Sequence, residues 1–103
     1  MKFCLFILVF VANAWAEVPD KDRQQQLINL LKHDCGACHG LSLKGGLGSP
    51  LLAEAIKDKG DTFLVSTILN GRKGTAMPPW RDFINEKEAQ WLVDFLRQNR
   101  IKQ

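Results

Sequence analysis

The sequence predicts an all-α domain, and three observations support that prediction. Apolar residues recur at helical spacing in several segments. Stretches rich in glycine and proline separate these segments. No sustained alternation of apolar and polar residues, which would indicate a strand, occurs anywhere in the 103 residues. We therefore expect about four helices in one small domain.

The beginning of the chain has the three-part layout of a secretory signal peptide. A positively charged start precedes an unbroken apolar run at residues 3–11, and Ala14 and Ala16 place small residues where signal peptidase cleaves. The run is shorter than the roughly 20 residues of a membrane-spanning helix. We expect residues 1–16 to be removed, leaving a mature domain of residues 17–103 without a stable membrane span. An uncleaved N-terminal anchor is the alternative.

The charge of the mature domain does not suggest a nucleic-acid-binding protein. Loss of Lys2 with the signal peptide lowers the formal net charge from +3 to +2, and no run of Lys and Arg exceeds two residues. A domain this short buries a small share of its surface. Only two cysteines remain after cleavage, three positions apart, so a disulfide closing a long loop is excluded. A bound cofactor is the expected source of additional stability.

The first predicted helix covers residues 22–34, and Gly36 follows it. Residues 40–50 form a glycine-rich loop, and residues 51–58 form a short helix that ends before Gly60. The apolar face of the first helix consists of Leu27, Ile28, Leu30 and Leu31.

Two further helices are predicted in the second half of the chain. Asp61 is the expected N-cap of a helix over residues 62–70, and Gly71 lies just past its end. A second loop rich in glycine and proline follows. Asn85 and Glu88 have the spacing of a capping box that opens the last helix. Its apolar face carries Leu92, Phe95 and Leu96, and its end carries Arg97, Arg100 and Lys102.

Residues 35–39 read C-G-A-C-H, the signature of covalent haem attachment. Two thiols separated by two residues on a helical turn can reach the two vinyl groups of one haem, and the adjacent histidine then lies beneath the iron. We predict that Cys35 and Cys38 bind haem c covalently and that His39 is an axial iron ligand. A redox dithiol would require a βαβ context, and a structural zinc site would require two separated ligand pairs.

Met77, the one methionine left after cleavage, is the predicted second axial ligand. A lone methionine is more often core filler, but Pro78 and Pro79 hold the backbone extended here. Gly71 and Gly74 allow the loop to approach a flat cofactor closely.

His33 is the alternative ligand, but it is tethered two residues before Cys35 on the proximal side of the haem. With both axial positions filled by His39 and Met77, no position is open for a substrate. The sequence therefore predicts a one-electron carrier and not an enzyme. The residues expected to bury the ring are Leu51, Phe63, Leu64, Ile68, Trp80 and Leu92.

In this order of features the chain resembles the class I cytochromes c over nearly all of the mature domain. Shared features are the helix before the C-x-x-C-H motif, the glycine- and proline-rich loops, the Met-Pro pair, and an aromatic-leucine pair in the last helix. The resemblance implies the cytochrome c fold, in which the first and last helices cross near the haem edge. More narrowly, residues 33–41, 45–48 and 68–72 look like those of the small cytochrome c-55X proteins.

The cytochrome c-55X resemblance implies a periplasmic role in denitrification. That family is encoded beside the haem-c/haem-d1 nitrite reductase and is thought to donate electrons to it or to assist its maturation. We expect a monomer that receives electrons from a quinol-linked donor and passes them to the reductase. A maturation factor for haem d1 insertion and a haem-based sensor are the alternatives. Cations that would steer an acidic partner are Lys44, Arg72, Lys73 and Arg81, although scattered charges are more often ordinary solvated surface.

Two departures from the class I pattern carry further expectations. Leu27 and Leu31 stand where many members have a glycine and an aromatic residue, which predicts a wider crossing of the first and last helices. Many members also use a proline carbonyl to accept a hydrogen bond from the proximal histidine. Here either the Ser49 or the Pro50 carbonyl is placed to serve.

Overall fold

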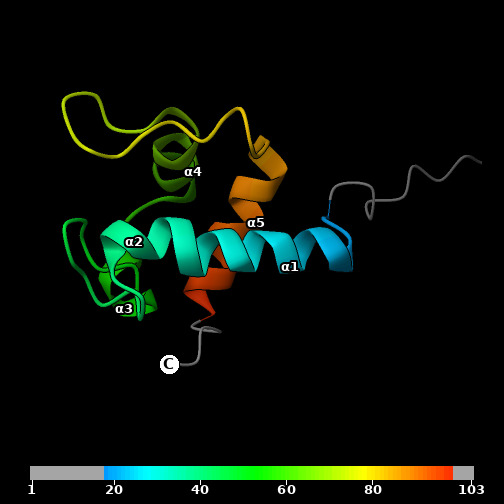
Figure 1. Ribbon diagram of the computed structural model, residues 1–103, viewed down its shortest axis with the longest axis horizontal. Helices are drawn as coiled ribbons and strands as arrows, with labels where there is room; N and C mark the ends of the chain where they lie inside the picture. Colours follow the sequence, from blue (N-terminus) through cyan, green and yellow to red (C-terminus); the bar gives the residue numbers. More distant parts are fainter. Residues whose placement is uncertain (1–17, 99–103) are drawn as a thin grey trace, which may run out of the picture.

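The computed structural model describes residues 18–98 (Figure 1). The expected signal peptide and the cations Arg100 and Lys102 lie outside this range. Every regular element within it is helical, which confirms the predicted all-α class. None of these helices is long and apolar enough to cross a membrane. The elements are α1 (Lys21–Leu30), a π-helical turn (Leu31–Cys35), α2 (Gly36–His39), α3 (Ala53–Ile56), α4 (Asp61–Asn70) and α5 (Glu86–Arg97).

The first helix is longer than predicted because it continues through the π-helical turn into α2. The Asp20 carboxylate caps its beginning by accepting a hydrogen bond from the Arg23 backbone N–H at 2.7 Å. At the π-helical turn the Gly36 N–H donates to the Leu31 carbonyl, five residues back, and the backbone stays helical. The helix ends at Gly40, whose φ of 94° favours glycine. The whole C-x-x-C-H motif therefore lies at the C-terminal end of one continuous helix.

Helix α4 begins after Gly60, so the prediction that Asp61 caps it is wrong. The Asp61 carboxylate instead accepts a hydrogen bond from Arg97 Nε of α5 at 2.8 Å. The same guanidinium donates to the backbone carbonyls of Ile56 and Lys59, at 3.2 and 2.6 Å. Since Asp61 is engaged by another helix, its side chain is not available for capping. The contact fastens the turn between α3 and α4 to the end of α5.

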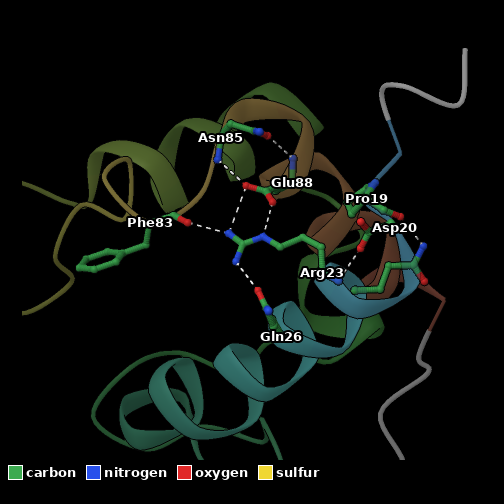
Figure 2. A network of polar contacts seen from close by, with 8 residues as sticks. Pro19, Asp20, Arg23, Gln26, Phe83, Asn85 and Glu88 are labelled. Atoms are coloured by element: carbon green, nitrogen blue, oxygen red, sulfur yellow. Dashed lines mark hydrogen bonds and ion pairs between the residues drawn. The ribbon is translucent and has the colours of Figure 1, made fainter.

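The capping box predicted at the beginning of α5 is confirmed. Asn85 Oδ1 accepts from the Glu88 N–H at 2.8 Å, and Glu88 Oε1 accepts from the Asn85 N–H at 2.9 Å. Figure 2 shows that Arg23 of α1 reaches the same carboxylate and also donates to the Phe83 carbonyl at 2.7 Å. Glu88 thus both caps α5 and joins it to α1.

The core forms where α5 crosses α1, with α4 packed alongside (Figure 1). Leu27 and Leu31 are buried in this core. The wider helix crossing predicted from these two leucines stays a prediction. Trp91 stacks on buried Phe95, with ring centroids 5.3 Å apart, and packs against the core. The buried residues that α5 contributes are Ala89, Leu92, Val93, Phe95 and Leu96.

The charge on Glu88 should contribute measurably to stability. Its hydrogen bond with Arg23 lowers the pKa of Glu88, against the opposing effect of burial, and only 13% of its side chain is exposed. We expect Glu88→Gln to lower the free energy of unfolding by about 1 kcal/mol at neutral pH. Glutamine retains an acceptor for the capping box, so the substitution removes mainly the charge. Urea unfolding measures the effect.

The pH dependence has a definite sign. A carboxylate whose pKa is lowered on folding stabilises the protein above its unfolded pKa of about 4.3, and this stabilisation is lost as the pH falls through the lowered value. The difference between wild type and Glu88→Gln should therefore close in acid. Glu86→Gln, in the same first turn and exposed, is the matched control and should change stability by less than about 0.5 kcal/mol. An equal effect in both variants would contradict the role of Glu88.

Candidate functional site

The two cysteines of the motif lie one helical turn apart at the end of the first helix. Cys35 closes the π-helical turn, and Cys38 lies in α2. Both are free thiols and half-buried. Burial, and secondarily the charge of Asp34, raises the pKa of the Cys35 thiol to about 11.

The structure brings all four predicted site residues to one place. Cys35, Cys38, His39 and Met77 line a hollow of about 120 Å³. A larger cavity of about 310 Å³ shares Cys35, His39 and Met77 with that hollow. Met77 comes from the loop after α4, and the other three come from the first helix. His33, the alternative ligand, is exposed and lines neither space.

The larger cavity is lined mainly by apolar side chains. All six residues predicted to bury the ring line it, including Phe63, Trp80 and Leu92. Two cations, Lys59 and Arg72, also line it, and the sequence did not single out Lys59. A large apolar space flanked by two thiols, an imidazole and a thioether fits haem c in shape and in donor chemistry.

Arg81, one of the four predicted steering cations, lines neither cavity of the site. Arg81 donates to Asn70 Oδ1 at 2.8 and 3.2 Å and lines a separate hollow between α4 and α5. Lys44 and Lys73 are exposed. Of the four cations, only Arg72 lines the larger cavity, and none lines the smaller hollow that contains both thiols.

The orientation of the His39 ring is fixed by a backbone carbonyl. His39 Nδ1 lies 2.7 Å from the Ser49 carbonyl oxygen, so Ser49 is the partner and not Pro50. A carbonyl only accepts, so Nδ1 carries the proton of this bond. In the neutral ring Nε2 then has its lone pair free, which is the form that binds a metal.

Gly48 lies against the same ring, and its role was missed at the level of sequence. A Cβ at this position would lie 2.7 Å from His39 Cε1 and Nδ1. The Gly48 N–H donates to the Cys38 carbonyl at 2.7 Å, and the Gly45 N–H donates to the His39 carbonyl at 2.9 Å. The loop after the motif therefore folds back onto the motif itself. The available signal was the cluster of glycines directly after the histidine.

Leu43 anchors this loop in an unfavourable backbone conformation. It has a φ of 59° and is 1% exposed. A non-glycine residue in that region costs on the order of 1–3 kcal/mol, and full burial of a leucine contributes about as much. The Leu43 N–H donates to Gly40 and the Leu43 carbonyl accepts from Leu51, at 2.8 and 2.9 Å. Burial of the Leu43 side chain and the hydrogen bonds of its backbone to both neighbouring segments therefore offset the strain.

The segment around Met77 also depends on a glycine. Gly71 has a φ of 68°, and a Cβ there would lie 2.6 Å from the Met77 carbonyl oxygen. The Arg72 N–H donates to this carbonyl at 3.2 Å, so the loop doubles back on itself. The Trp80 N–H donates to the Ile68 carbonyl of α4 at 3.1 Å and anchors the far end of the loop.

Known proteins with similar sequences are cytochromes. The family model described as cytochrome c oxidase, cbb3-type, subunit III, matches residues 22–96. Cytochrome c55X of Paracoccus denitrificans (strain Pd 1222) is 41% identical over 95 residues, which cover 92% of each chain. Cytochrome c55X of Pseudomonas aeruginosa (strain PAO1) is 52% identical over 85 residues, which cover 82% of this chain and 71% of the relative.

Two solved structures are similar in fold and in sequence. The c-type cytochrome NirC has a TM-score of 0.76 and 51% identity, over 78% of this chain and 94% of its own. Dihydro-heme d1 dehydrogenase NirN in complex with DHE has a TM-score of 0.65 and 30% identity. That match covers 74% of this chain and 16% of the dehydrogenase.

The close approach of Gly48 to His39 can be tested with a single methyl group. Gly48 does not have a positive φ, so alanine tests the steric contact without added backbone strain. We expect Gly48→Ala to lower the free energy of unfolding of the haem-loaded protein by about 1–3 kcal/mol, because the imidazole or the loop must shift. Guanidinium denaturation measures the loss.

Gly60→Ala is the matched control for this substitution. No atom lies within 4 Å of a Cβ built at Gly60, and its φ of −71° suits alanine. We expect a loss of about 1 kcal/mol or less, from the poorer N-cap. Equal losses at the two glycines would show that the contact with His39 carries no cost.

Proposed function

We propose that this chain, which belongs to the cytochrome c55X family of c-type cytochromes, carries single electrons in the periplasm to a dissimilatory nitrite reductase. The c-type cytochromes of this family contain covalently bound haem c and are electron carriers, not enzymes. The convergence of two thiols, an imidazole and a thioether on one hollow, beside a larger apolar cavity that shares three of these groups, is the observation that best supports the proposal.

In this proposal each of the four side chains has a distinct task. Cys35 and Cys38 would attach the haem through thioether bonds, and His39 Nε2 and the Met77 sulfur would be the protein ligands of the iron. The haem, when bound, supplies a one-electron couple between ferric and ferrous iron. The Ser49 carbonyl keeps Nε2 of His39 directed at the cavity through its 2.7 Å contact with Nδ1.

The residues around the cavity set the conditions for electron transfer. A thioether ligand favours ferrous iron, so Met77 raises the reduction potential above that of a site with two histidines. Apolar walls such as Leu64, Ile68 and Leu92 disfavour the extra charge of the ferric state and act in the same direction. With both axial positions filled by the protein there is no open position for a gas or a substrate, which favours a carrier over a sensor.

Two exposed leucines suit brief docking of a redox partner. Leu41 and Leu47 are 77% and 82% exposed and lie on the loop after the motif, and Leu47 lines both cavities. A small apolar contact of this kind is typical of weak electron-transfer encounters. We propose this surface as the route for electrons to the reductase and from a quinol-linked donor.

The periplasmic location rests on residues 1–16 and on the chemistry of attachment. The charged start, the apolar run and the small residues at 14 and 16 form a signal peptide in this proposal, and residues 17–103 form the mature monomer. Haem c is attached outside the cytoplasm, so attachment requires export.

Maturation of the nitrite reductase is the second candidate function. The observation that favours it is the similarity to part of a dihydro-heme d1 dehydrogenase. In that role the chain would act on haem d1 or on the immature reductase, and it would not supply electrons during turnover.

Substitution of the proposed second ligand tests the site. We expect the haem-loaded wild type to show a low-spin ferrous spectrum and the weak far-red band of methionine bound to ferric iron. Met77→Ala should lose this band and gain carbon monoxide binding in the ferrous state, since the sixth position is then open. Visible spectroscopy of both proteins checks the result. A high-spin wild type, or a Met77→Ala spectrum equal to that of wild type, would contradict thioether ligation.

A strain that lacks this chain separates the two candidate functions. If the chain supplies electrons, the nitrite reductase from that strain contains its full haem d1 while the cells consume nitrite slowly. The wild-type gene should restore the rate and the Met77→Ala gene should not, because the variant loses the raised potential. A reductase that lacks haem d1 would instead indicate the maturation role.

A further inference from the structure

We infer that Thr75 is a positioning residue for Met77, and that its hydroxyl holds the loop in the shape that presents the thioether to the cavity. The inference rests on the proposed function, in which the Met77 sulfur is an iron ligand. It concerns a side chain that binds neither the iron nor the haem covalently and acts through the backbone of Met77.

Thr75 lies at the centre of a ring of hydrogen bonds. Its Oγ1 donates to the Arg72 carbonyl at 2.7 Å and accepts from the Met77 N–H at 3.3 Å. Its backbone N–H donates to the same carbonyl at 3.0 Å. The Arg72 N–H donates to the Met77 carbonyl at 3.2 Å. Four hydrogen bonds thus connect three residues within a six-residue stretch, and the hydroxyl takes part in two of them.

The backbone of this stretch has few other restraints. Gly71 and Gly74 both have positive φ, 68° and 81°. The two residues after Met77, Pro78 and Pro79, have no N–H to donate. Over residues 18–98, the Met77 N–H has no acceptor besides the Thr75 hydroxyl. Loss of that hydroxyl therefore releases the only hydrogen bond at the nitrogen of the proposed ligand.

The hydroxyl can be separated from the turn that contains it. Residues 72–75 form a turn closed by the Thr75 N–H, with Gly74 supplying the positive φ at its third position. Valine keeps the N–H and the β-branched shape of threonine and lacks only the hydroxyl. Thr75→Val should therefore preserve the turn while the Met77 backbone loses its tether.

A small displacement of Met77 would have a large effect on ligation. Metal and catalytic sites need their groups held within about 0.5 Å of the productive position. Thr75 also lines both cavities, so the restraint is applied beside the space that the ring would fill. The Thr75 hydroxyl thereby sets the fraction of protein molecules in which the Met77 sulfur is bound to the iron.

The test compares haem-loaded wild type with Thr75→Val, Thr75→Ser and Ser66→Ala. The Ser66 hydroxyl accepts a hydrogen bond from Asn70 Nδ2 at 3.2 Å within α4, and Ser66 lines neither cavity, so its alanine variant loses a similar bond away from the site. The readouts are the far-red ferric band and the rate of carbon monoxide binding to the ferrous protein. We expect Thr75→Val to lose at least half of the band and to bind carbon monoxide about tenfold faster, a change of about 1.4 kcal/mol.

Thr75→Ser keeps the hydroxyl and should restore both readouts, and Ser66→Ala should match wild type. A Thr75→Val protein equal to wild type in both readouts overturns the inference, as does a serine variant that is as impaired as the valine variant. If the valine variant does not fold, Thr75→Ala removes the same hydroxyl without added bulk. We then expect for Thr75→Ala the results stated for Thr75→Val, and the same contrary results overturn the inference. A wild type that itself lacks the far-red band overturns the proposed ligation, which is a distinguishable failure.

Discussion

The hydrogen bond between His39 Nδ1 and the Ser49 carbonyl is the interaction around which the rest of the site is arranged. The bond requires the loop after the motif to return to the imidazole, with the Ser49 carbonyl oxygen 2.7 Å from Nδ1. At Gly48 the loop runs so close to the ring that there is no space for a Cβ. That return path forces Leu43 into a left-handed conformation, which its complete burial stabilises. This one contact thus accounts for the need for glycine at position 48 and for the strained backbone of Leu43. It also accounts for the two backbone hydrogen bonds from the loop to the end of the first helix.

The two sides of the cavity are built on different physical principles. On the His39 side a continuous helix supplies the ring, and a buried anchor holds the adjacent loop. On the Met77 side the backbone is irregular and is held by a few exposed hydrogen bonds around Thr75. Segments with few buried contacts and exposed backbone bonds open at the lowest free-energy cost. The methionine side is therefore the side on which small changes in sequence should alter the site without unfolding the domain.

Features set by neighbouring residues could be predicted from the sequence, and features set by distant contacts could not. The helical class and the Asn85 capping box follow from local spacing, and both are present. The residues predicted to bury the ring do line the larger cavity, but that prediction depended on the haem-attachment motif and not on local spacing. Asp61 has the chemistry of an N-cap, but Arg97, 36 residues away, takes its carboxylate. Ser49 and Pro50 are equivalent candidates in the sequence, and only the path of the loop selects Ser49. The pairing of Arg23 with Glu88 likewise depends on how the first and last helices meet.

The cavity walls show why a bound haem would stabilise the fold as well as supply the chemistry of the protein. Leu31, Leu92, Val93 and Leu96 belong both to the buried core and to the lining of the larger cavity. A flat apolar ring placed there continues the core, and a ligand that binds only the folded state stabilises that state. The proposed iron ligands are oriented by backbone contacts, through Ser49 on one side and Thr75 on the other. Both contacts are made to uncharged groups of the chain, so neither would have to break when a bound iron gains or loses one electron. A small carrier needs this property, because atoms that do not move contribute no barrier to electron transfer.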